Sequence, residues 1–214
     1  MRPPVILIVG GIGSGKSFVA GLFEEAGGVV RIDADLIGHE VLTRADVIQE
    51  LAEGFGPGIL DATGRVDRRA VAARVFGPGN EAARSRLEAT THPRIRVEIE
   101  RRIADAWKNP EIRAIVLDAA IGLETGWNSL VDRVVYVEVP DEERLRRVQA
   151  SRGWSEEELR RRELSQWTLE RKRSAAHHRV ENSGSIDGVR QQVRDILDQI
   201  VIPPRENGPS QSSC

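Results

Sequence analysis

Short runs of apolar residues alternate with amphipathic segments along most of the chain. Residues 5–9 are all aliphatic and are closed by two glycines, which is typical of a buried parallel strand. Four further runs, at residues 29–32, 114–118, 134–139 and 179–181, predict the other strands. Because helical patterns fall between these runs, we expect an α/β fold in three layers: a parallel five-stranded sheet with helices on both faces.

The segments between the strands carry apolar positions at helical spacing. Residues 18–23 predict the first helix, which Gly27 and Gly28 end. Further helices are predicted over residues 36–42, 47–55, 67–76, 81–107, 141–149, 156–166 and 185–200. Asp67 and Ser185 are the residue types that cap such helices. His92–Pro93 interrupts the longest segment, and because proline lacks a backbone donor, we expect that helix to kink or restart.

Composition narrows the class of protein. The 214 residues are 40 % hydrophobic and carry 31 basic against 33 acidic side chains, so a net charge of -2 excludes a DNA-wrapping protein and favours no nucleic-acid partner. The only cysteine is Cys214, which favours a reducing compartment. The first apolar run is too short for a signal peptide or a membrane span. We therefore expect a cytoplasmic protein without a membrane partner, and a disordered tail over residues 203–214.

One motif carries chemistry. Residues 10–17, Gly-Gly-Ile-Gly-Ser-Gly-Lys-Ser, match the P-loop pattern at the place it requires, after a strand and opening a helix. The glycines let backbone N–H groups surround phosphate oxygens, and the helix N-terminus adds a partial positive charge. Lys16 is then expected to contact the β- and γ-phosphates of ATP, and the Ser17 hydroxyl to ligate Mg²⁺. The alternative, a glycine-rich turn with an incidental lysine, does not account for the flanking strand and helix.

The chain lacks the signatures of two common P-loop classes. None of its lysines lies in the Asn-Lys-x-Asp motif with which GTPases bind the base, and Ala119 follows Asp118 where an ATPase usually has glutamate. A small-molecule phosphotransferase or a nucleotide-binding module remains.

Two acids lie where a kinase needs one. Asp33 and Asp35 follow the second predicted strand, and the carboxyl ends of parallel strands meet at the edge that holds the P-loop. One carboxylate can accept the proton of an acceptor hydroxyl while the other holds Mg²⁺ or a neighbouring cation. The alternative is a pair that only caps a turn.

A cover over the phosphates is expected between Arg144 and Lys172, a segment that overlaps the most arginine-rich part of the chain, residues 152–179. Arg162 and Gln166 are four residues apart and share one helix face. Arginine-bearing helices of this kind are typical of a phosphate-closing lid, and a solvated charged helix is the alternative interpretation.

Four motifs in this order resemble the dephospho-CoA kinase family: the P-loop, Ile32-Asp-Ala-Asp35, His92-Pro93 and Asn182-Ser-Gly184. The resemblance covers residues 5–200. It implies ATP-dependent phosphorylation of the ribose 3′-hydroxyl of dephospho-CoA, the last step of coenzyme A synthesis. It also implies one P-loop kinase domain over residues 1–202, with a core (1–35, 112–140 and 178–202), an acceptor-binding helical region (36–110) and a lid (144–176).

The resemblance assigns roles residue by residue. Asp35 is implied as the general base, with Lys16 and the lid residue Arg147 as catalytic cations. The nucleotide is implied to contact Gly11, Gly13, Ser14, Gly15, Lys16, Ser17, Phe18, Asn182 and Gly184. The acceptor is implied to contact Asp33, His92, Arg94, Asp118, Glu124 and Arg162. ATP and Mg²⁺ are the implied cofactors, dephospho-CoA is the implied substrate, and the chain is expected to be a monomer or a weak homo-oligomer.

The sequence departs from the family pattern after the third strand. Residues 118–124, Asp-Ala-Ala-Ile-Gly-Leu-Glu, keep both acids but lack the usual proline and one leucine. This change bears on the acceptor, so another small-molecule or nucleotide kinase is the first alternative function. A nucleotide-binding module that does not catalyse is the second.

Overall fold

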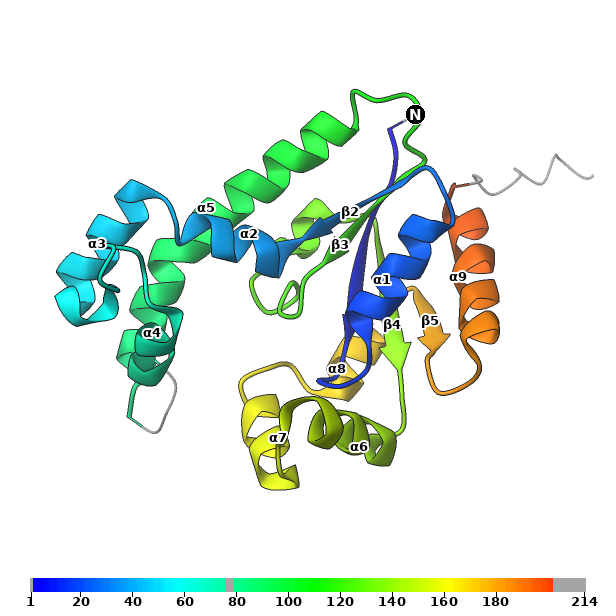
Figure 1. The fold of residues 1–214 in the computed structure, drawn as a ribbon. Coiled ribbons are helices and arrows are strands. Elements are labelled where there is room, and N and C mark those ends of the chain that lie inside the picture. The colour runs from blue at the N-terminus through cyan, green and yellow to red at the C-terminus, as the bar shows by residue number, and fades with distance from the viewer. Residues whose placement is uncertain (1, 76–78, 202–214) are drawn as a thin grey trace, which may run out of the picture.

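A parallel sheet of five strands forms the centre of the protein in a computed structural model that describes residues 2–75 and 79–201 (Figure 1). The strand order is β2-β3-β1-β4-β5, and every pairing is parallel. The strands are β1 (Val5–Gly10), β2 (Val29–Asp33), β3 (Ala114–Asp118), β4 (Arg133–Glu138) and β5 (His178–Glu181). The predicted α/β fold with a parallel five-stranded sheet is confirmed.

Helices cover both faces of the sheet. Neighbouring side chains of a strand point to opposite faces, and every residue of β1 and β3 is buried. On one face, Ile6 and Ile8 pack with the buried sides of α1 (Lys16–Glu25) and α9 (Ile186–Val201). On the other face, Val5 and Leu7 pack with α5 (Glu81–Ala106). The chain thus forms the three layers that the apolar runs predict.

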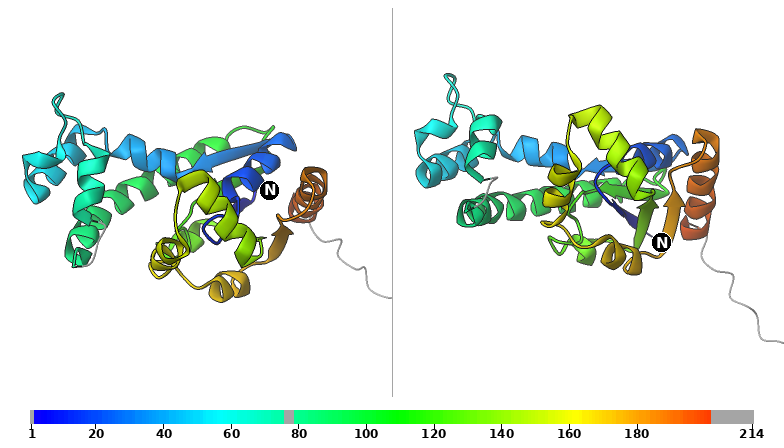
Figure 2. Two further views of the ribbon diagram at one scale, coloured as in Figure 1. Left: turned by 60° about the horizontal axis from the view of Figure 1, so that its bottom comes forward. Right: turned by 90° about the horizontal axis from the view of Figure 1, so that it is seen from below.

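The region between β2 and β3 is helical and extends away from the sheet (Figures 1 and 2). It contains α2 (Ala34–Val41), α3 (Ala45–Phe55), the short 3₁₀ turn η1 (Pro57–Ile59), α4 (Arg68–Val75) and α5. Asp67 caps α4 as predicted, since its Oδ1 accepts hydrogen bonds from the backbone N–H of Arg69 (2.8 Å) and Ala70 (3.3 Å). Phe76, the predicted last residue of α4, lies outside the described residues.

Helix α5 runs through Pro93 without a break, so the restart that the sequence allowed does not occur. Proline removes one backbone donor, and side chains supply others nearby: Arg94 Nη1 donates to the Thr90 carbonyl (2.7 Å) and Thr91 Oγ1 to that of Leu87 (2.8 Å). Ile95 and Ile99 are buried just after the proline, and their packing in the core stabilises the second half of the helix.

The segment between β4 and β5 folds into α6 (Asp141–Arg152), α7 (Glu156–Glu163) and α8 (Leu169–Ser174), which lie near the P-loop end of the sheet (Figure 2). Helix α7 ends three residues before the predicted end, because Leu164 and Ser165 form a turn, and Thr168 then caps α8. A 3₁₀ turn, η2 (Trp127–Leu130), precedes β4. In the described part of the chain, no helix has the length and apolarity to cross a bilayer. The predicted tail, residues 203–214, lies outside that part.

Candidate active site

The glycine-rich loop between β1 and α1 has the conformation of an anion cradle. Gly13 and Gly15 have φ angles of 81° and 79°, which disfavour any side chain. Their surroundings exclude one as well: a Cβ on Gly13 would lie 2.7 Å from the Arg144 carbonyl oxygen, and one on Gly15 would lie 2.5 Å from Asn182 Nδ2. The loop therefore requires glycine at both positions and presents backbone rather than side chains.

Lys16 begins α1 and folds back over the loop. Its Nζ donates to the carbonyls of Gly10 (3.4 Å) and Gly11 (3.2 Å). Burial, and then the nearby ammonium of Lys172, lower the pKa of Lys16 to about 8. Among the described residues no carboxylate forms an ion pair with Lys16, so its ammonium can bind an anion.

The neighbouring loop residues divide into buried and accessible ones. Gly11 and Ser14 are buried, and the Ser14 hydroxyl has no hydrogen-bond partner among the described residues. Ser17 and Phe18 are exposed in the first turn of α1, so the Ser17 hydroxyl is accessible from solvent.

Two carboxylates meet at the ends of β2 and β3. Asp33 and Asp118 are paired in register on the two strands, and Arg31 Nη2 lies 2.6 Å from Asp118 Oδ2 and 3.5 Å from Asp33 Oδ2. Asp33 also caps α2, because its Oδ1 accepts the Leu36 N–H at 2.9 Å. The capping role that the sequence offered as an alternative is therefore confirmed for Asp33. Asp35 is not the capping residue and lies in the first turn of α2.

Asp35 stands in the first turn of α2 beside this pair. Burial, and then the charges of Asp33 and Asp118, raise the pKa of the Asp35 carboxyl, while Lys16 opposes the shift. The influence is mutual, since the charges of Asp118 and Asp35 oppose the larger effects that lower the pKa of Lys16. The P-loop cation and the acid that follows the second strand thus face the same part of the molecule.

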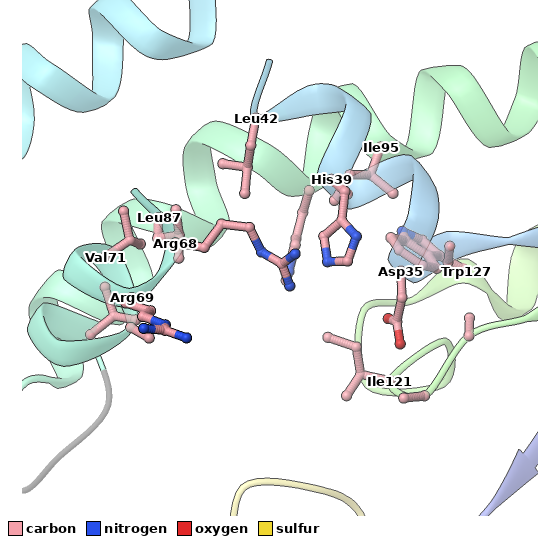
Figure 3. A pocket seen from close by; sticks show the side chains of 17 residues that line it. Asp35, His39, Leu42, Arg68, Arg69, Val71, Leu87, Ile95, Ile121 and Trp127 are labelled. Carbon is pink, nitrogen blue, oxygen red and sulfur yellow. The ribbon is translucent and has the colours of Figure 1, made fainter. Parts of the chain in front are cut away.

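A cavity of about 820 Å³ opens beside Asp35, between α2, α4, α5 and the loop after β3 (Figure 3). His92 lines it, with its ring edge against Trp127 (centroids 6.3 Å apart), and burial lowers the pKa of the imidazole. The floor includes Ala119, Ala120 and Ile121, from the stretch that departs from the family pattern. Of the six predicted acceptor residues, His92 alone lines this cavity, and it does so together with Asp35, the predicted base.

The other predicted acceptor residues do not line this cavity. Arg94 is bound by carboxylates of α3, with Nε 3.0 Å from Asp46 and Nη2 2.8 Å from Glu50. Arg162 Nε lies 2.6 Å from Glu158 Oε1, and its guanidinium stacks 4.1 Å from the Trp154 ring centroid. Arg94 thus joins α5 to α3, whereas Arg162 packs on its own helix α7 and on the loop that precedes it.

Glu124 is also not among the residues that line the cavity. Its Oε1 lies 3.0 Å from Lys172 Nζ and accepts the Trp167 N–H at 2.9 Å. This carboxylate therefore joins the loop after β3 to the segment that precedes α8.

Arg147 and Asn182 lie beside the P-loop. Arg147 Nη2 donates to the Asn182 carbonyl (2.8 Å) and Nε to Glu143 (2.8 Å), while Asn182 Nδ2 donates to the Ser14 carbonyl (2.8 Å). These bonds connect α6, the end of β5 and the loop. Gly184 is exposed two residues further on.

Sequence reasoning missed Arg144, whose side chain is 1 % exposed. Its Nη1 donates to the Ile12 carbonyl of the P-loop (3.0 Å), its Nη2 to Asp141 (2.7 Å), and it also pairs with Glu163 of α7. In the sequence, Asp141 and Arg144 have the spacing of an ordinary surface pair. No local signal distinguishes this arginine from its neighbours.

A parallel sheet with a glycine cradle, a loop lysine and an acid at the adjacent strand end defines a P-loop kinase of small molecules. A sequence model of the family described as dephospho-CoA kinase matches residues 4–188. The chain belongs to the dephospho-CoA kinase family.

Relatives match over most of their length. The dephospho-CoA kinase of Corynebacterium diphtheriae is 39 % identical over 193 residues, which cover 90 % of this chain and 94 % of the relative. That of Carboxydothermus hydrogenoformans is 38 % identical over 195 residues, 91 % and 93 % of the two chains.

Solved structures agree with this assignment. A crystal structure from Thermus thermophilus, 33 % identical, superposes with a TM-score of 0.77 and covers 92 % of this chain and 97 % of that one. The dephospho-CoA kinase of Campylobacter jejuni, 25 % identical, gives 0.64 and covers 93 % and 98 %. A shikimate kinase from Acinetobacter baumannii, 21 % identical with a TM-score of 0.52 over 92 % and 93 % of the chains, shares the fold.

Proposed function

We propose that the protein transfers the γ-phosphoryl group of ATP to the ribose 3′-hydroxyl of dephospho-CoA. One observation carries the proposal. Asp35 lines the cavity and also lies within electrostatic reach of Lys16, so an acceptor hydroxyl in the cavity would stand between a base and the phosphate loop. The names of the relatives support the identity of the acceptor.

The chain's own residues account for the transfer. The N–H groups of residues 11–17 hold the phosphates, and Lys16 and Arg147 stabilise the charge that develops on the transferred group. Asp35 accepts the proton of the 3′-hydroxyl as the hydroxyl oxygen forms a bond to the γ-phosphorus. The bond between the γ-phosphorus and the β–γ bridging oxygen breaks, which releases ADP. Its raised pKa makes it a stronger base than an ordinary carboxylate.

Magnesium fits the loop. The described residues contain no cluster of three or more metal-ligating side chains, which agrees with an ion held mainly through phosphate oxygens and water. Ser17 would hold it through its accessible hydroxyl. When bound, Mg²⁺ neutralises charge on the β- and γ-phosphates.

The remaining predicted residues take supporting places in this proposal. Asn182, Gly184 and Phe18 lie around the loop and would border the nucleotide. Asp33 and Asp118 set the charge around Asp35. The contacts of Arg94, Glu124 and Arg162 favour positioning roles over contact with the acceptor. We also infer a monomer or weak homo-oligomer in a reducing cytoplasm, which light scattering and cell fractionation test.

A coupled assay of ADP release tests the function. Dephospho-CoA, adenosine, AMP and shikimate are offered as acceptors with ATP and Mg²⁺, and the phosphorylated product is identified by mass spectrometry. We expect turnover with dephospho-CoA far above the other three, and none with the Lys16→Ala variant. A preference for another acceptor indicates a different small-molecule kinase, and ATP binding without turnover on any acceptor indicates a module that does not catalyse.

A further inference from the structure

The wall of the cavity opposite Asp35 carries two arginines, Arg68 and Arg69, at the start of α4. Figure 3 shows both guanidinium groups directed from α4 into the cavity, with Asp35 across from them. Asp35 is the one carboxylate among the lining residues of this cavity within the described chain. The far end of the cavity is therefore electropositive, whereas the end at Asp35 is not.

These two guanidinium groups differ from most arginines around them. Arg94 and Arg102 of α5, for example, are bound by carboxylates of neighbouring helices. In the part of the chain that the structure describes, Arg68 and Arg69 form no side-chain hydrogen bond or ion pair. The first backbone N–H groups of α4 are meanwhile occupied by the Asp67 carboxylate. An anion entering this end would thus be met by side-chain donors and not by the helix terminus.

We propose that Arg68 and Arg69 bind the diphosphate of the acceptor. The inference rests on the proposed function and adds the residues that recognise the acceptor's charged middle. In dephospho-CoA the diphosphate follows the ribose whose 3′-hydroxyl reacts, so a ribose at Asp35 directs the diphosphate along the cavity toward α4. Planar guanidinium forks match phosphate oxygens in pairs and are weakly hydrated, which suits this ligand better than lysine.

The apolar part of the lining fits the same ligand. It comes from α2, α4 and α5 and includes Leu42, Val71, Val75 and Leu87. The pantetheine arm leaves the diphosphate on the side away from the ribose and is the least charged part of the acceptor. The cavity thus offers an acid, two cations and an apolar surface, which suit the ribose hydroxyl, the diphosphate and the arm.

Binding of acceptor to protein saturated with a non-hydrolysable ATP analogue tests the inference, because the P-loop is then occupied. Isothermal titration calorimetry with dephospho-CoA and with adenosine is carried out on the wild type, Arg68→Met, Arg69→Met and the double variant. We expect each single change to weaken dephospho-CoA binding about 10-fold and both together about 100-fold or more, as for lost charged hydrogen bonds. Adenosine, which lacks the diphosphate, should bind all four proteins alike.

Arg65→Met is the matched control, since Arg65 is an exposed arginine three residues before Arg68 and lies outside the cavity. It should leave both ligands unaffected, and Arg68→Lys should give an intermediate loss. The inference is overturned if the double variant binds dephospho-CoA as tightly as the wild type does. It is also overturned if the affinity for adenosine falls as much as that for dephospho-CoA, or if Arg65→Met weakens binding equally. Wild-type turnover with dephospho-CoA leaves the proposed function intact in each of these cases. Absence of wild-type turnover with dephospho-CoA refutes the proposed function. Titration of inorganic pyrophosphate into the proteins saturated with the ATP analogue then tests whether the two arginines bind a diphosphate at all. Equal pyrophosphate affinity in the wild type and the double variant shows that they do not.

Discussion

Lys172 of α8 and Glu124 of the loop after β3 form an ion pair inside the protein, with Nζ 3.0 Å from Oε1. The Lys172 side chain is 1 % exposed and its ammonium also donates to Gln166 Oε1 at 2.8 Å. The same loop supplies Ala119 to Ile121 of the cavity floor. The ion pair therefore links α8 to the loop that forms part of the cavity wall.

Breaking this pair should destabilise the protein strongly. Lys172→Met leaves Glu124 as a buried charge without its cation, and we expect a loss of about 3–5 kcal/mol in the free energy of unfolding, measured by urea denaturation. Lys108→Met is the control, because its exposed pair with Asp105 should contribute at most about 1 kcal/mol. Equal losses in the two variants would show that Lys172 is no more than a surface charge.

Asp35→Asn should remove the base without removing the nucleotide site. We expect kcat to fall about 10²- to 10⁴-fold, as for loss of a general base, with the Kd of ATP unchanged. Steady-state kinetics and calorimetry measure the two quantities, and Asp105→Asn, a change of an exposed surface acid, serves as the control. A parallel loss of ATP affinity contradicts the role given to Asp35.

The pH dependence of turnover should follow the charges around Asp35. Activity falls when this carboxyl is protonated, so its raised pKa places the acid limb of kcat/KM above that of an ordinary aspartate. Asp33→Asn removes a neighbouring negative charge and keeps a good N-cap for α2, so the limb should move to lower pH. A limb that stays in place, with turnover retained, excludes Asp35 as the group that titrates.

ATP binding should take up protons near pH 8. The pKa of Lys16 is about 8 in the free protein, and bound phosphates favour the charged ammonium and raise it. Calorimetry at pH 8 in two buffers of different ionisation enthalpy should show an uptake of roughly half a proton per ATP. Two variants identify the group that takes up the proton. Lys16→Met should abolish the uptake, and Lys108→Met, a change of an exposed lysine, should keep it. Uptake that survives in Lys16→Met assigns the proton to another group.

The strands, the P-loop and most helix boundaries follow from the sequence because their signals are local. A run of five aliphatic residues closed by two glycines favours a buried strand, and Gly13 and Gly15 adopt positive φ angles that disfavour other residue types. Asp67 and Ser185 identify helix starts for the same reason: a capping oxygen bonds an N–H two or three residues away.

Contacts between distant segments were settled by tertiary structure alone. Glu124 and Lys172 are far apart in sequence, and nothing near either residue indicates that one neutralises the other. Arg94 pairs with α3 instead of the cavity because the packing of α5 decides which face each side chain occupies. Local residue patterns determine strands, caps and the phosphate loop, but which charges stay buried in pairs and which remain open to a ligand depends on how the helices pack.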